Sequence, residues 1–151
     1  MKQDISQKKV GIDFGSYDSI VIKKHITDIE GGRTLDVTDF PESVILAGHV
    51  IISKVVNNEK VYLPTPIKQV LVNNEPQVDE DGNKVYAYDT LPTGASYEGI
   101  LYRSILTEKP AASILIDGVV NDEVMKIKLG AIESAFKAAC PHIIFNHDEE
   151  A

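Results

Sequence analysis

The chain contains no tryptophan, only one cysteine and few aromatic residues. The single Cys140 cannot form an internal disulfide, so we expect stability to come from an apolar core or from assembly, in a protein made in a reducing cytoplasm. No stretch approaches the roughly 20 apolar residues of a membrane-spanning helix, and the first residues lack the apolar run of a signal peptide. We therefore expect no membrane partner and no export by a signal peptide.

Basic residues are also in short supply, with 15 Lys and Arg against 23 Asp and Glu and a formal net charge of -8. Proteins that bind nucleic acid concentrate Lys and Arg on one face. Here the basic residues are dispersed among acidic ones. Nucleic acid is therefore not an expected partner.

Apolar sequence, in contrast, is sufficient for a folded domain. The 151 residues are 43% hydrophobic and 25% charged, which is typical of one globular domain. Short runs rich in Val and Ile recur between turn residues, which predicts a mostly β, α+β fold: a small sandwich or barrel of antiparallel strands. We expect one domain over residues 1–151, with an N-terminal arm at 1–9, a loop-rich excursion at 64–92 and an acidic tail at 147–151.

Turn residues locate several of these strands. Asn57 and Asn58 predict a tight hairpin, because Asn tolerates the positive φ angles that such turns need. Gly48 divides an apolar run and predicts a bulge or a bend. Tyr86 and Tyr88 lie two residues apart in a predicted strand, so we expect both rings to be exposed on one face. Strands are predicted over residues 10–14, 19–24, 34–38, 44–52, 55–56, 60–63, 70–72, 84–88 and in the C-terminal third, with a turn at 15–18.

One helix is predicted near the C-terminus. Over residues 129–139, the apolar side chains of Ile132, Ala135, Phe136 and Ala139 recur with helical spacing. Pro141 ends this helix, and a final short strand follows. Asn121 is expected to cap a separate helical turn at residues 122–125.

Three patterns that could indicate chemistry have simpler interpretations. Residues 11–19 (GIDFGSYDS) resemble the first phosphate loop of actin-like ATPases, but that fold needs a much longer chain, so a hairpin turn is favoured. Residues 79–83 (DEDGN) lack the terminal Glu of an EF-hand, which favours a solvated turn over a calcium site. Cys140, His142 and His147 are too few for a zinc site. We expect no metal, no cofactor and no catalytic residue, and hence not an enzyme.

The last third of the chain carries a family resemblance. Residues 99–101 read GIL, residues 112–122 read ASILIDGVVND, a helix rich in Ala and Lys follows, and residues 141–145 read PHIIF. Over roughly residues 94–146 this order resembles the head decoration proteins of tailed bacteriophages. The resemblance implies a structural virion protein, located on the capsid exterior, that binds the major capsid protein, assembles as a homotrimer and stabilises the shell.

The resemblance and the aromatic residues together suggest where contacts form. An N-terminal arm that orders on the capsid places Ile5, Lys8 and Lys9 at the interface with capsid subunits. Aromatic residues anchor interfaces, so Tyr86, Tyr88, Tyr97 and Tyr102 are further candidates. Two alternatives stay open: a receptor- or glycan-binding β module, against which the lack of Trp counts, and the base of a head fibre.

Overall fold

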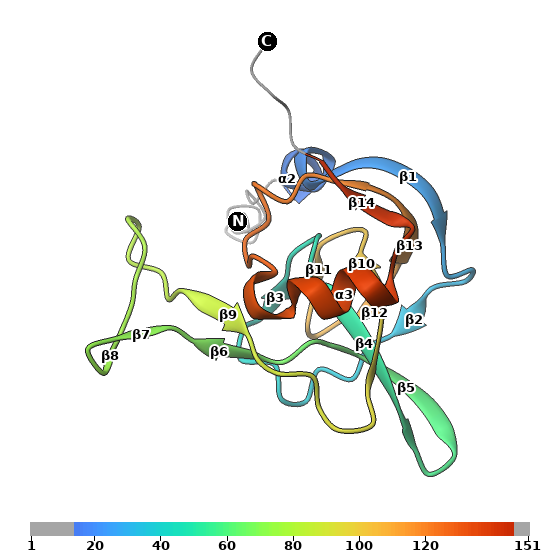
Figure 1. Ribbon diagram of the computed structural model, residues 1–151, viewed down its shortest axis with the longest axis horizontal. Helices are drawn as coiled ribbons and strands as arrows, with labels where there is room; N and C mark the ends of the chain where they lie inside the picture. Colours follow the sequence, from blue (N-terminus) through green and yellow to red (C-terminus); the bar gives the residue numbers. More distant parts are fainter. Residues whose placement is uncertain (1–13, 147–151) are drawn as a thin grey trace, which may run out of the picture.

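The structure is a computed structural model in which residues 14–146 are described (Figure 1). Strands account for 44% and helices for 12% of it, and a short C-terminal helix precedes a final strand, which confirms the predicted mostly β, α+β fold. Ile5, Lys8, Lys9 and the rest of the expected arm at 1–9 lie outside the described residues, as does the tail at 147–151.

Six strands form the central sheet. Five of them follow in the order β1-β13-β10-β4-β5, and β14 also pairs with β13. Their bounds are Ile22–Asp28 (β1), Val50–Val56 (β4), Glu59–Pro64 (β5), Ser96–Leu101 (β10), Ile114–Val120 (β13) and Ile143–Phe145 (β14).

Strand β13 has partners along both edges. One edge pairs antiparallel with β1, and the other is divided between antiparallel β10 and parallel β14. The parallel pairing follows from the connection, because a helical crossover between β13 and β14 returns the chain to the same end of the sheet. That crossover consists of the 3-10 helix η1, Gly130–Ile132, and the helix α3, Glu133–Ala139.

Four two-stranded sheets surround the central sheet, and each is antiparallel. Two of them, β3 with β11 and β2 with β12, join segments that are distant in sequence. The other two lie within the expected excursion, and in Figure 1 β7 and β8 extend away from the rest of the molecule. Their bounds are Arg33–Thr34 (β2), Val44–Ile45 (β3), Ile67–Gln69 (β6), Leu71–Val72 (β7), Glu75–Pro76 (β8), Tyr86–Tyr88 (β9), Ile105–Leu106 (β11) and Ala111–Ala112 (β12).

The central sheet buries apolar side chains on both faces. Successive strand residues point to opposite faces, so Val50 and Leu115 join one core cluster while their neighbours Ile51 and Ile114 join the other. Helix α3 covers the first face through Phe136, which is fully buried. The small sheets β2–β12 and β3–β11 contribute to the second cluster.

Several local predictions are confirmed. The β4–β5 hairpin turns at Asn57 and Asn58, whose φ angles are 52° and 66°. Gly48 has a φ of 97° and separates β3 from β4, as expected of a bend. In the predicted C-terminal helix Ile132 and Phe136 are buried. Ala135 and Ala139, the other two residues of the predicted apolar face, are exposed.

The predicted turn at residues 15–18 and the predicted start of the next strand at residue 19 are wrong, whereas residues 10–13 of the strand predicted before them lie outside the described residues. Residues 15–18 are not a turn and residues 19–21 are not strand, because the helix α2 occupies Phe14–Val21 and β1 begins only at Ile22. Contacts distant in sequence hold this helix. Asp18 accepts hydrogen bonds from the backbone N–H and the hydroxyl of Ser104, and Val21 is fully buried in the core. Tertiary packing thus outweighs the local turn preference of Gly, Ser and Asp.

Two shorter predictions also need correction. Within residues 34–38, regular pairing stops after Leu35, because Asp36 accepts hydrogen bonds from the backbone N–H and the hydroxyl of Thr38 and forms a local turn. The predicted helical turn at residues 122–125 is wrong, because these residues form a non-helical turn and bend. Asn121 nevertheless caps that turn, since its side-chain oxygen accepts the N–H of Glu123 at 3.0 Å.

Candidate functional site

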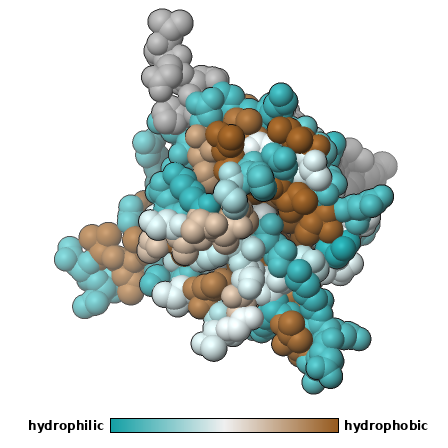
Figure 2. Space-filling view, turned by 45° about the vertical axis from the view of Figure 1, so that its right-hand side comes forward, coloured by the Kyte–Doolittle hydropathy of each residue, from teal (hydrophilic) through white to brown (hydrophobic). Residues whose placement is uncertain are grey.

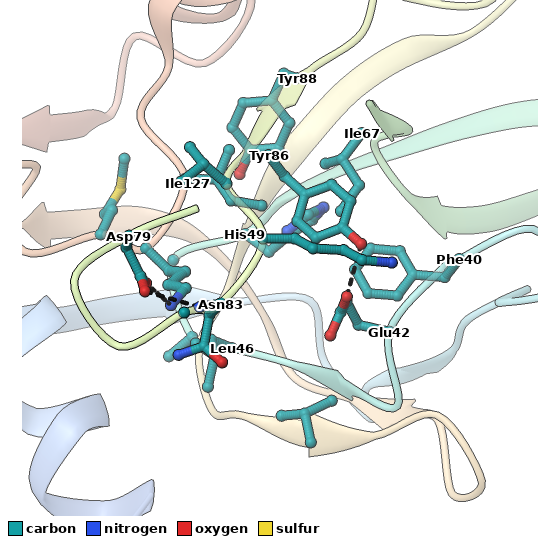
Figure 3. Close-up of a pocket in the computed structure, with 18 residues that line it drawn as sticks. Phe40, Glu42, Leu46, His49, Ile67, Asp79, Asn83, Tyr86, Tyr88 and Ile127 are labelled. Atoms are coloured by element: carbon teal, nitrogen blue, oxygen red, sulfur yellow. Dashed lines mark hydrogen bonds and ion pairs between the residues drawn. The ribbon is translucent and has the colours of Figure 1, made fainter. Parts of the chain in front are cut away.

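A cleft of about 1020 Å³ lies between three segments of the chain (Figure 3). Its walls come from residues 40–49, from residues 79–88 of the excursion and from residues 125–127. Binding clefts for small ligands are commonly of this size and mostly apolar. We refer to this feature as the cleft.

Three rings in edge-to-face contact contribute to the cleft. The imidazole of His49 lies between Phe40 and Tyr88, with ring centroids 5.3 and 5.1 Å away and edge-to-face geometry. The His49 Nε2 is 3.1 Å from the carbonyl oxygen of Thr65. The Tyr88 hydroxyl accepts the backbone N–H of Val50 at 3.0 Å. These contacts fix the rings in place, so this part of the cleft is preorganised.

Burial shifts the titration of both polar rings. It disfavours the charged imidazolium and lowers the pKa of His49 from 6.5 to about 4, although the hydrogen bond to Thr65 acts in the opposite direction. Burial likewise raises the pKa of the Tyr88 hydroxyl, because a phenolate would be charged. Both groups are therefore neutral at physiological pH.

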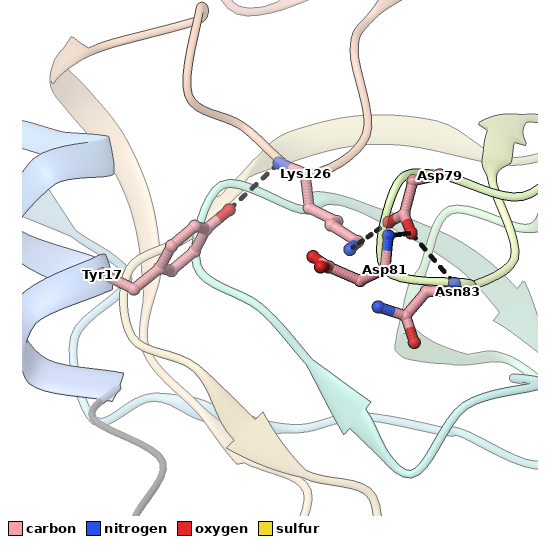
Figure 4. A network of polar contacts seen from close by, with 5 residues as sticks. All are labelled: Tyr17, Asp79, Asp81, Asn83 and Lys126. Atoms are coloured by element: carbon pink, nitrogen blue, oxygen red, sulfur yellow. Dashed lines mark hydrogen bonds and ion pairs between the residues drawn. The ribbon is translucent and has the colours of Figure 1, made fainter.

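Charged groups lie on the more exposed walls of the cleft. The Tyr86 hydroxyl donates a hydrogen bond of 2.7 Å to Glu42. Asp79 accepts the backbone N–H groups of Asp81 and Asn83, both at 2.9 Å. The side chain of Lys126 is 3.8 Å from Asp79 (Figure 4). The acidic turn at residues 79–83 is thus stabilised by hydrogen bonds from its own backbone N–H groups to Asp79. The amine of Lys126 lies close to it.

A hydrogen bond connects the cleft to the N-terminal helix. The Tyr17 hydroxyl on α2 accepts the backbone N–H of Lys126 at 3.0 Å (Figure 4). It also donates to the carbonyl of Val124 at 3.4 Å. The segment 124–127 is therefore fixed on one side to α2 and on the other to the acidic turn through the Lys126 pair with Asp79.

Potentially reactive side chains in the described part of the chain are largely buried. His49 lies between the rings of Phe40 and Tyr88, is 5% exposed and is neutral at physiological pH. Within residues 14–146, no group of three His, Cys, Asp or Glu side chains is placed to hold a metal ion. Cys140 is buried, which raises the pKa of its thiol to about 11 and keeps it protonated at neutral pH.

A second feature projects from the body next to the cleft. The β7–β8 hairpin turns at Asn73 and Asn74, which have φ angles of 55° and 66°. Every residue from 71 to 78 is exposed, including the apolar side chains of Leu71 and Val72. Figure 2 shows hydrophobic and hydrophilic residues side by side on the projecting parts of the molecule. We refer to residues 71–76 as the hairpin tip.

The structure places the expected interface tyrosines in different surroundings. Tyr86 and Tyr88 do share a face, as the strand period predicts, and both line the cleft. That face packs against the body, however, so the expectation that both rings are exposed is wrong for Tyr88, which is 4% exposed. Tyr97 packs edge-to-face on Phe136 at 5.6 Å, and Tyr102 lies 4.6 Å from the ring of His25. Both are half-buried and pack against the core.

No family model, curated protein or solved structure matches the chain. The resemblance to decoration proteins therefore stays a prediction from the sequence. None of the helices in the described part of the chain has the length and hydropathy needed to cross a membrane.

Sequence reasoning missed two parts of the site. His49 lies in the apolar run 44–52, and this position was a signal of burial. Leu71 and Val72 immediately precede an Asn-Asn pair, and two apolar residues beside so tight a turn indicate an apolar hairpin end. No signal in the sequence places Phe40 and Tyr88 on either side of His49, because that arrangement depends on the tertiary fold.

Proposed function

We propose that this chain is a structural virion protein that binds the outer surface of a phage capsid and ties neighbouring capsid subunits together as a homotrimer. Its partners are then the major capsid protein and other copies of the chain. It is synthesised in the host bacterial cytoplasm and acts on the capsid exterior. This role requires no catalytic residue and no cofactor.

The observation that carries the proposal is the projecting hairpin tip. Leu71 and Val72 belong to neither core cluster and are exposed at the end of a hairpin. Burying such a side chain against another protein gains about 1.5–3 kcal/mol. A hairpin of this kind contributes little to the fold of one chain, and its composition suits a contact with a second protein.

The sheet offers a different kind of attachment at its other side. Among residues 14–146, β13 is the only strand that pairs with β1, so β1 is an edge strand of the described sheet. An extended arm adds to such an edge through main-chain hydrogen bonds. The N-terminal arm expected at residues 1–9 is suited to this contact on a neighbouring molecule.

Repetition makes modest contacts effective. A protein bound at many equivalent sites of a shell engages each neighbour from an already tethered position, so weak interfaces combine into strong overall attachment. The symmetry of a shell also presents the same surface to every copy. Stabilisation of a capsid therefore does not require one large interface per chain.

One observation favours a second candidate, a receptor- or glycan-binding module. The Tyr86 ring and the Glu42 carboxylate lie together on the wall of the cleft, which combines an aromatic surface with a polar group. Recognition sites often have this composition. Loss of glycan-array binding on Tyr86→Ser, with capsid binding absent in both proteins, would support this candidate over the first.

The proposal is tested by mixing purified protein with undecorated capsids of the parent phage, pelleting the shells and counting bound copies. We expect saturation at a multiple of three copies per local three-fold site. Deleting residues 1–9 is expected to abolish it. The control is V55S/V56S, which removes exposed apolar groups at the end of the β4–β5 hairpin and is expected to leave capsid binding unchanged. Failure to bind intact shells would reject the capsid role.

A further inference from the structure

We infer that the hairpin tip of one copy docks into the cleft of a second copy, so that the chain associates head to tail with itself. This inference deepens the proposed function. It rests on that proposal because capsid binding brings several copies of the chain side by side. It identifies the self-association surface, which the resemblance leaves open. The occupant of the cleft is then a protein segment rather than a small molecule.

The hairpin tip has the properties of an inserting element. Leu71 and Val72 are 57% and 52% exposed, although a Leu or Val side chain gains free energy when buried. The two residues pair with Pro76 and Glu75, and the turn between them has two residues with positive φ. Such a turn matches the natural twist of a hairpin and holds its shape. A preorganised tip loses little conformational entropy on docking.

The cleft has the complementary properties. It is concave, and its lining includes the rings of Phe40 and Tyr86 and the aliphatic side chains of Ile67 and Ile127. Its volume of about 1020 Å³ is enough for several side chains. The edge-to-face contacts of His49 with Phe40 and with Tyr88 are already formed in the single chain. Docking therefore requires no rearrangement of this part of the cleft.

Charge supports the same pairing. The chain has a net charge of -8, so two copies repel one another unless opposite charges meet locally. Glu75 lies on the hairpin tip, and the amines of Lys84 and Lys126 lie on the cleft. Within residues 14–146, neither Glu75 nor Lys84 has a recorded ion-pair partner, and the Lys126 pair with Asp79 is long at 3.8 Å. A docked tip places the acidic Glu75 near these amines.

The geometry predicts the type of assembly. The hairpin tip extends away from the body in Figure 1, whereas the cleft lies against the body. The two surfaces are different, so the contact is heterologous: each copy gives its tip to one neighbour and receives a tip from another. Contacts of this type close into rings when the rotation between copies permits it. A closed ring of three copies is consistent with the proposed trimer.

Cysteine cross-linking tests the contact directly. Two single variants, V72C on the tip and N83C at an exposed position on the cleft, are treated with a short bis-maleimide, separately and mixed. The native Cys140 does not compete, because it is buried and its thiol has a raised pKa of about 11. We expect a cross-linked dimer in the mixture that neither variant gives alone. V55C, at a valine on the other hairpin that is 68% exposed against 52% for Val72, is the control for random encounters.

Equal cross-linking of N83C with V55C and with V72C, or no cross-link in the mixture at the highest attainable concentration, would overturn the inference. A cross-link of V72C with itself would instead indicate a symmetric contact between tips and would also reject it.

Sedimentation equilibrium supplies a second test. L71S/V72S is expected to weaken self-association about tenfold or more, with V55S/V56S unchanged. E75K and K84E are each expected to weaken it several-fold, and the double variant E75K/K84E to restore it. Association that is the same in all five proteins would refute the docking.

Capsid pelleting separates this inference from the proposed function. If L71S/V72S still binds shells but no longer self-associates in sedimentation equilibrium, the capsid role stands and the tip is confirmed as the self-association surface. If L71S/V72S self-associates as strongly as wild type, the docking is refuted, whatever the result with shells. If wild-type protein self-associates but does not bind shells, only the capsid role fails.

Discussion

Acid is expected to destabilise the protein through one buried histidine. His49 is neutral in the folded protein, with a pKa of about 4 against 6.5 for an exposed imidazole. Between these two pH values the unfolded chain binds a proton that the folded chain does not bind. The free energy of unfolding therefore falls as the pH is lowered through this window, and it is fully retained above pH 6.5.

The size of the effect follows from the two pKa values. They differ by about 2.5 pH units, and at about 1.36 kcal/mol per unit the full difference is roughly 3 kcal/mol. A typical domain has a stability of only about 5–15 kcal/mol. Protonation of His49 thus removes a substantial part of the stability, and it does so beside Phe40 and Tyr88 on the cleft.

The assay is urea denaturation followed by circular dichroism at several pH values between 6.5 and about 4. The matched variant is His49→Gln, because the Gln amide can still donate to the Thr65 carbonyl but does not titrate. The other three histidines, His25, His142 and His147, are present in both proteins, so the difference between the two pH profiles isolates His49. Parallel loss of stability in wild type and His49→Gln would refute the reasoning.

Two further substitutions test the packing of the central sheet. Phe136→Ala removes the fully buried ring of α3 and is expected to lower the free energy of unfolding by about 3–5 kcal/mol, measured by urea denaturation. The control is Ala138→Ser at an exposed position of the same helix, which is expected to lower it by about 0.5 kcal/mol. Similar losses in the two variants would contradict the role of Phe136. Gly99→Ala places a Cβ 2.2 Å from the carbonyl oxygen of Leu115, so we expect a loss of about 1–3 kcal/mol in thermal unfolding. Ser96→Ala on the same strand is the control, and a neutral Gly99→Ala would show that β10 and β13 can separate without cost.

Local signals in the sequence were sufficient for the elements that local chemistry determines. Asn57 and Asn58 adopt positive φ, which is the property that predicted their hairpin. The helical spacing of Ile132 and Phe136 predicted the helix that covers the sheet. In both cases the deciding residues lie within a few positions of one another.

The elements that the sequence did not predict depend on distant contacts. Helix α2 is held by Asp18 with Ser104 and by Tyr17 with Lys126, pairs that are 86 and 109 residues apart. A period of two shows which residues share a face of a strand, but it does not show which face meets the body. For this reason the shared face of Tyr86 and Tyr88 was predictable and the burial of Tyr88 was not.

The pairing of β13 also sets the order in which the sheet can form during synthesis. The early strand β1, Ile22–Asp28, has its partner in β13, which ends at Val120. The ribosome therefore produces all of residues 29–113 after β1 before β13 begins, and β14 follows later still. Topologies dominated by such non-local contacts fold slowly. Until β13 emerges, β1 and β10 lack their final partner, and the nascent chain is then most prone to aggregation.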